Sequence, residues 1–284
     1  MPRRYLDPKI DLAFKRVFGE HKELLKSFLN ALLPLADDGQ IESLDYLTPE
    51  QVPEIPGLLK LSIVDVKCQD AKGRIFIVEM QMHWSSSFQS RMVFGGAQAF
   101  VKQLGKGGSY VSLQPVYALA LVNDIFDRQT PNFYHHYQIV NLQNTQETLP
   151  GLEFVFIELP KFKPENIIGK RMQVLWLRFL NEIGEGGIPP DTEMQADENI
   201  AHALDLVEVA AFTDAELDRY HSDLDHARLV ASMFGDFEAK GRKEGLAEGK
   251  AELVKAMHQN GLNAEQISQF TQLSLQSVKQ ILSL

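Results

Sequence analysis

Two apolar runs that carry carboxylates restrict the possible folds of this chain more than any other feature. Residues 61–69 and 74–83 are rich in Ile, Val and Phe, which favours β-strands with at least one buried face. Asp65, Glu79 and Gln81 lie inside these runs. A buried carboxylate costs free energy unless it is paired or binds a cation, so the fold must compensate these acids.

The segment between the two runs predicts that they pair as a β-hairpin. The loop 71–73 ends in glycine, which is typical of a three-residue turn with a bulge. In that register Asp65 faces Glu79 with Cβ atoms about 5 Å apart, and Gln81 and Lys67 point to the same face. A divalent cation would remove the repulsion between the two acids, and oxygen ligands favour Mg²⁺ or Mn²⁺. Alternatively, the four polar side chains form the solvated face of an ordinary hairpin.

The rest of the chain predicts a mixed α/β core followed by a helical extension. Apolar spacing indicates helices before and after the hairpin, then strands, then helices to the end. The predicted helices are 7–19, 21–35, 85–105, 167–183 and 200–212, and the further strands are 114–124, 137–142 and 152–159. We expect a domain at residues 1–235 and a separate extension at residues 236–284.

Charge and composition limit the classes of partner. The net charge is −10, but residues 1–110 hold 14 basic and 13 acidic residues, so the acidity lies in residues 111–284. A nucleic-acid site is therefore possible only in the first part of the chain. No apolar run approaches the roughly 18 residues that a membrane span needs. The single cysteine excludes an intramolecular disulfide, and a cytoplasmic location is expected.

The extension carries two features that point to assembly. Glycines at 241, 245 and 249 share one helical face, which is typical either of close packing between two helices in a homo-oligomer or of a solvated linker helix. Residues 260–284 predict a small helix-turn-helix with a capping box and a core of Ile267, Phe270, Leu273, Val278 and Ile281. Its second helix has only Lys279 as a positive charge, which favours packing over DNA reading.

These segments together resemble a known family. An acid, a hairpin and then Glu-x-Gln resemble the motif of the PD-(D/E)XK nucleases. DPKIDLAFKRVFG at residues 7–19, IVDVKCQDAKGRIFIVEMQ at 63–81 and the glycine-rich charged helix near 241–249 resemble the Rpn recombination-promoting nuclease/transposase family. The resemblance covers residues 5–255, and three separate segments agree in order and spacing.

The resemblance implies a PD-(D/E)XK restriction-endonuclease-like core, a mixed four-stranded sheet flanked by helices, and cleavage of DNA phosphodiester bonds that depends on Mg²⁺ or Mn²⁺. Carried over by position, Asp65 is the central metal ligand and Glu79 the second. The backbone carbonyl of Met80 adds a further ligand, and Asp11 on the first helix completes the set. Gln81 occupies the place of the usual lysine.

Gln81 departs from the motif, since lysine would supply positive charge beside the attacking water and the phosphate. Glutamine orients water but offsets no charge. Lys67 on the neighbouring strand and Arg91 on the next helix are the candidates for the missing cation. The competing interpretation is a weakly active or inactive nuclease-fold protein that acts in DNA binding or protein assembly.

Overall fold

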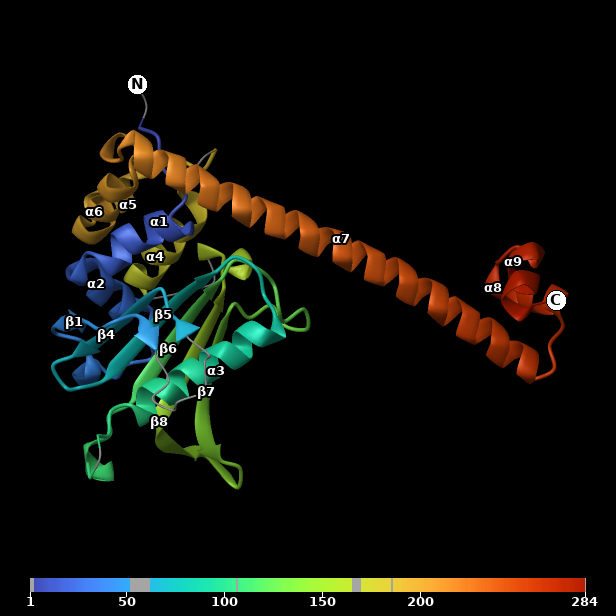
Figure 1. Cartoon of the computed structure of the whole chain (residues 1–284), viewed down its shortest axis with the longest axis horizontal. Coiled ribbons are helices and arrows are strands. Elements are labelled where there is room, and N and C mark those ends of the chain that lie inside the picture. Colours follow the sequence, from blue (N-terminus) through green and yellow to red (C-terminus); the bar gives the residue numbers. More distant parts are fainter. Residues whose placement is uncertain (1–2, 52–61, 106, 165–169, 185, 284) are drawn as a thin grey trace. The chain divides into compact units, whose positions relative to one another are not determined.

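The computed structural model describes residues 3–51, 62–105, 107–164, 170–184 and 186–283 (Figure 1). The chain divides into two compact units, Met1–Asp225 and His226–Leu284. Two predictions fall partly outside the described residues: the first residue of the run 61–69 and the start of the helix 167–183.

A six-stranded mixed sheet forms the centre of the first unit, in the order β1-β4-β5-β6-β8-β7. Strands β5, β6 and β8 are parallel to one another, and the other neighbours are antiparallel. The strands are β1 (Leu44–Tyr46), β4 (Val66–Asp70), β5 (Ile75–Gln81), β6 (Val116–Val122), β7 (Tyr134–Asn141) and β8 (Asn144–Glu158). A separate antiparallel pair is formed by β2 (Glu50–Gln51) and β3 (Ser62–Ile63).

The β4–β5 hairpin confirms the predicted register. Val66 pairs with Val78 and Cys68 with Phe76, which places Asp65 across from Glu79 at the open end. Gly73 has φ of 83°, a conformation that a glycine adopts without strain, and closes the turn. The side chain of Asp70 accepts hydrogen bonds from the Arg74 backbone and guanidinium, so the turn is held by a buried ion pair.

Helix α3 (Ser86–Val101) covers one face of the sheet. Ser85 accepts a hydrogen bond from the Phe88 N–H and caps the helix, as its sequence predicts. Phe88 and Met92 pack on alternate residues of the strands, among them Ile77 and Ala120. Close packing is possible because α3 carries glycine at residue 96, where a Cβ would lie 3.0 Å from the Phe154 ring.

The other helices of the first unit lie together, away from α3 (Figure 1). Phe18, Phe28 and Trp176 form an aromatic cluster with ring centroids 4.3 to 5.5 Å apart. The helices of this group are α1 (Asp11–Phe14), the π-helical turn η1 (Lys15–Gly19), α2 (Lys22–Leu32), α4 (Arg171–Glu182), α5 (Thr192–Ala196) and α6 (Glu198–Val207). The first unit also contains the short 3₁₀ turns η2 (Asp37–Gly39), η3 (Tyr110–Ser112), η4 (Leu159–Lys161) and η6 (Val209–Ala211).

Three local differences from expectation have physical causes. The sheet has six strands instead of four, because the predicted strand 137–142, which is β7, pairs with β8 at one edge and the short β1 pairs with β4 at the other. Strand β8 begins at Asn144, earlier than predicted, because a polar segment pairs with β7 as a hairpin. The first helix begins at Asp11 because the Asp7 side chain accepts the Lys9 N–H and holds a turn there.

Helices are the only regular secondary structure among the described residues of the second unit. Helix α7 (Asp214–Gln259) begins in the first unit and continues into the second, followed by α8 (Ala264–Thr271) and α9 (Leu275–Leu282). The predicted capping box of Asn263 with Gln266 is present. Ile267 and Val278 are buried as predicted, but Phe270 is 70% exposed, because the small core is completed by Val254 of α7 instead.

In the described part of the chain, no helix combines the length and the apolarity needed to cross a membrane.

Candidate active site

Asp65 and Glu79 meet where β4 begins and β5 ends. Asp65 immediately precedes β4, and its Oδ2 accepts a hydrogen bond of 2.7 Å from the Met80 N–H of β5. Glu79 is only 4% exposed although it lies near the end of its strand. The hairpin register, which the sequence encodes locally, therefore brings two carboxyl groups together in a poorly solvated place.

Burial and mutual repulsion disfavour the ionised forms of both acids. Burial, followed by the charge of Asp65, raises the pKa of Glu79 to about 8. Burial also raises the pKa of Asp65, and the charge of Asp11 adds to this effect, whereas the Met80 N–H, Lys15 and Arg91 oppose it. The cations already present therefore do not neutralise the pair.

Asp11 is the third acid near this point and comes from α1. Its carboxylate forms an ion pair with Lys15, with 2.8 Å between Oδ1 and Nζ, and both side chains are about two-fifths exposed. Lys15 begins the π-helical turn, a distortion that often accompanies functional sites. The charge of Lys15 also acts on Asp65 and Glu79. The sequence interpretation missed this lysine, although its spacing of four residues from Asp11 is the signal that could have identified it.

Arg91 of α3 joins the acids to Gln81. Its guanidinium lies 3.5 Å from the Glu79 carboxylate and donates a hydrogen bond of 3.1 Å to the Gln81 side-chain oxygen. The Gln81 amide nitrogen donates in turn to the His83 carbonyl. The place of the motif lysine is thus occupied by an amide that is hydrogen-bonded to an arginine.

Lys67 lies on the predicted face of β4, but the charged group that acts on it is Lys102 and not Asp65 or Glu79. Burial, followed by the charge of Lys102 at the end of α3, lowers the pKa of Lys67. The cations that act on Asp65 and Glu79 are instead Lys15 and Arg91.

The Met80 carbonyl is on the side of β5 that faces Asp65. The N–H and C=O of one strand residue point to the same side, and the Met80 N–H bonds to Asp65. The next carbonyl, that of Gln81, points the other way and accepts the Asn123 N–H after β6. The Met80 carbonyl and the Asp65 carboxylate therefore lie on the same side of β5, and the role of this carbonyl as a metal ligand stays a prediction.

The donor set suits a hard divalent cation. Asp65, Glu79 and the Met80 carbonyl offer only oxygen atoms, which is the preference of Mg²⁺ and Mn²⁺. Burial raises the pKa values of both carboxyl groups, and nearby carboxylates add to the effect, so a bound cation would favour their ionised forms. Asp11 would become a ligand if its carboxylate left its ion pair with Lys15 and bound the metal ion instead.

Glu158 is a further buried acid, at the end of β8, which the sequence interpretation missed. Its carboxylate accepts the N–H groups of Phe126 and Asp127 and contacts His135 and Lys161 at 2.8 and 2.6 Å. Although burial opposes them, these interactions lower the pKa of Glu158. Because both oxygens are already occupied, this acid holds the loop after β6 in place and is not available to a metal.

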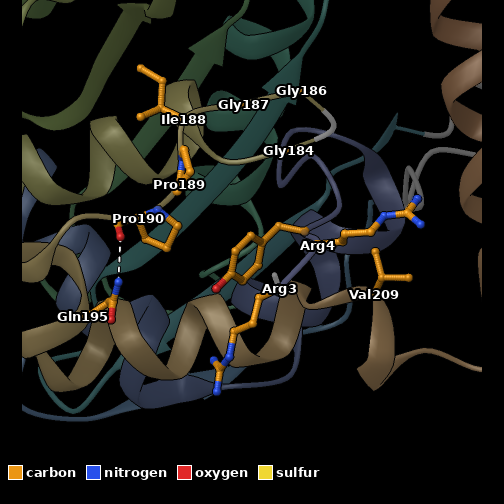
Figure 2. Close-up of a pocket in the computed structure, with 11 residues that line it drawn as sticks. Arg3, Arg4, Gly184, Gly186, Gly187, Ile188, Pro189, Pro190, Gln195 and Val209 are labelled. Atoms are coloured by element: carbon orange, nitrogen blue, oxygen red, sulfur yellow. Dashed lines mark hydrogen bonds between the residues drawn. The ribbon is translucent and has the colours of Figure 1, made fainter. Parts of the chain in front are cut away.

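A cavity of about 590 Å³ lies elsewhere in the first unit, between the N-terminal segment and the loop around residues 184–190 (Figure 2). Arg3 and Arg4 line it, and the described lining residues include no carboxylate. Arg3 is already paired with Asp205 at 2.6 Å. Among the described residues that line it, this cavity offers no carboxylate or imidazole for metal-assisted hydrolysis.

Comparison with known proteins gives one finding. A family model described as PD-(D/E)XK nuclease family transposase matches residues 8–231. Neither the curated proteins nor the solved structures include a significant match to the chain. The matched range contains Asp65, Glu79 and Asp11 together with Lys15 and Arg91.

Proposed function

Because the chain belongs to the PD-(D/E)XK nuclease family of transposases, we propose that it is an Mg²⁺- or Mn²⁺-dependent DNA endonuclease of the recombination-promoting type. The observation that carries this proposal is the pairing of the half-buried Asp65 with the buried Glu79, since the pKa values of both are raised. Two acids paired in this way destabilise the fold when ionised, and a bound cation would compensate that cost. Strongly shifted pKa values of this kind often mark functional sites. The single cysteine is consistent with action in the cytoplasm.

Asp65, Glu79, the Met80 carbonyl and Asp11 would hold the cation. When bound, such a cation stabilises charge on the phosphate and lowers the pKa of a coordinated water. The protein residues themselves position the groups around it. The Met80 N–H fixes the orientation of the Asp65 carboxylate, and Arg91 holds Gln81 and Glu79 in their places.

Arg91 is well placed to bind the scissile phosphate, since its side chain is 47% exposed while its guanidinium reaches Glu79. Gln81 can accept a hydrogen bond from water and keep it oriented for attack. Lys67 remains a proposed catalytic residue, as the alternative source of positive charge. No protein nucleophile is required by this scheme.

We expect Arg91→Ala to lower DNA cleavage by about 10- to 100-fold, because it removes a charge aimed at the phosphate. Lys67→Ala should have the smaller effect, since Lys67 is influenced by Lys102 instead of the acids. Gln81→Lys should retain or raise activity by supplying the motif charge. Single-turnover cleavage rates at saturating Mg²⁺ would test this order. A larger loss in Lys67→Ala than in Arg91→Ala would assign the role to Lys67.

The direct test of the proposed function is nicking of supercoiled plasmid by the full-length protein with Mg²⁺ or Mn²⁺, compared with the same reaction in excess chelator. Cleavage that requires the metal supports an endonuclease. The second candidate, a nuclease-fold protein that binds DNA or assembles without cleavage, is favoured by glutamine at residue 81. DNA binding without nicking under either metal would support that candidate.

A homo-oligomer formed through α7 is part of the proposal. Leu229, Met233 and Phe237 of α7 are exposed, and the glycines at 241 and 245 have open space around them. Close helix packing in a dimer would cover such a surface.

Truncation after residue 236 is expected to convert a dimer to a monomer, which light scattering would detect as a mass loss larger than the removed segment. Gly245→Gln tests the same face in the full chain. Its side chain meets open space in the isolated helix, so only a helix–helix contact would exclude it. Full-length protein that is monomeric at high concentration would contradict this expectation.

A further inference from the structure

Two histidines and a glutamate from distant parts of the first unit converge outside the proposed active site. His21 precedes α2, Glu23 lies in its first turn, and His202 lies on α6. The Nδ1 atoms of His21 and His202 lie 3.6 and 3.8 Å from the same Glu23 oxygen. One ligand atom from each residue lies within 4.8 Å of the other two.

These distances are close to those of a transition-metal site. With Zn–N and Zn–O bonds of about 2.0–2.1 Å in a tetrahedron, ligand atoms lie about 3.3–3.4 Å apart. Two of the three separations therefore exceed the ideal by a few tenths of an ångström, which small side-chain rotations can close. All three side chains are partly exposed, so a water molecule can reach the remaining position.

Glu20 adds a further carboxylate near this cluster, while the neighbouring cation Lys22 is paired with Asp45 at 2.7 Å. Burial raises the pKa of Tyr46, and Cys68, Glu23 and Glu20 add to the effect. Glu20 and Glu23 thus lie near the same hydroxyl, which donates to the Phe18 carbonyl at the end of the first helical segment. A second carboxylate close to the His–Glu–His group favours a cation over an anion there.

We propose that His21, Glu23 and His202 bind one Zn²⁺ ion. Imidazole nitrogens suit zinc, whereas the oxygen-only set at Asp65 and Glu79 suits Mg²⁺. The ion would link α2 to α6, two helices far apart in sequence. It would therefore stabilise the packing of these helices in the first unit. Metal binding to the native state alone raises its resistance to unfolding.

Calorimetric titration of the metal-stripped full-length protein with Zn²⁺, in millimolar Mg²⁺ that competes for the oxygen ligands, tests the proposal. One Zn²⁺ per chain is expected, together with a rise in the unfolding temperature. His202→Ala and His21→Ala should each weaken zinc binding by about 100-fold or more, and Glu23→Gln by at least about tenfold. A Co²⁺-loaded sample should lose its visible absorption in the same variants.

His136→Ala is the matched control, because His136 also faces a carboxylate, that of Glu153 at 2.9 Å, but has no third ligand among the described residues. It should bind zinc as the wild type does. Circular dichroism of each variant checks that the fold is intact, and the conservative change His202→Gln gives a second test where alanine disturbs α6. Zinc affinity unchanged in His21→Ala and His202→Ala, or reduced equally in His136→Ala, would overturn the proposal.

Discussion

Asp65→Asn is expected to lower Mg²⁺-dependent DNA cleavage by about 10³-fold or more, which corresponds to roughly 4 kcal/mol of transition-state stabilisation. Asparagine keeps the shape of the side chain and can still accept the Met80 N–H through its oxygen, so the hairpin should remain intact. What it removes is the negative charge of the central metal ligand. The loss should therefore appear in cleavage and in metal affinity, while the metal-free protein should unfold at a temperature at least as high as the wild type does, because the charge removed is disfavoured in the fold.

Single-turnover nicking and calorimetry with Mn²⁺ measure the two effects on one protein preparation. Asp45→Asn is a suitable control, because Asp45 is 86% exposed and pairs only with Lys22 among the contacts described. It should retain wild-type cleavage and metal binding. If Asp65→Asn cleaves DNA at the wild-type rate, Asp65 is not the central ligand and the proposed mechanism is wrong.

Glu79→Gln is expected to stabilise the metal-free protein at alkaline pH while it removes the stabilisation that metal confers. The folded pKa of Glu79 is raised to about 8 from its ordinary value of 4.5. A carboxyl group with a raised folded pKa favours folding below its unfolded pKa, and this contribution is lost as the pH rises through the folded value. Glutamine stays neutral, so the variant should be more stable than the wild type above pH 8, by on the order of 2 kcal/mol.

Thermal unfolding between pH 4 and pH 9, with and without Mg²⁺, would show the effect. Near pH 4 the two proteins should unfold at similar temperatures, and the difference should grow as the pH approaches 9. Magnesium should raise the unfolding temperature of the wild type more at pH 8 than at pH 6, because protons compete with the cation. In the variant it should have little effect.

Glu158→Gln supplies a control of opposite sign. Glu158 is fully buried, yet hydrogen bonds lower its pKa, so its ionised form favours the folded state. Its replacement should destabilise the protein at neutral pH. If Glu79→Gln also destabilised the metal-free protein at pH 8, the Glu79 carboxylate would be compensated in the fold, and the argument for a cation at this point would fail.

The sequence by itself determined the central hairpin and the two acids at its end. The apolar runs, the turn glycine and the pairing of Asp70 with Arg74 are all local, so they fix the register of β4 against β5 without help from the rest of the chain. Once the register is fixed, Asp65 must face Glu79, and the Met80 carbonyl must lie on the same side. The capping box of α8 was equally predictable because its partners are three residues apart.

Only the tertiary structure decided which charges surround these acids. Lys67 follows Asp65 by two residues, yet Arg91 and Lys15 are the cations that act on the pair. Their positions depend on how α3 and η1 pack against the sheet, and helix packing is set by side-chain shapes that no local pattern records. The same reason applies to His202, which joins His21 and Glu23 only because α6 packs beside α2. Local pairing is encoded in neighbouring residues, whereas contacts between distant elements exist only after the whole unit has folded.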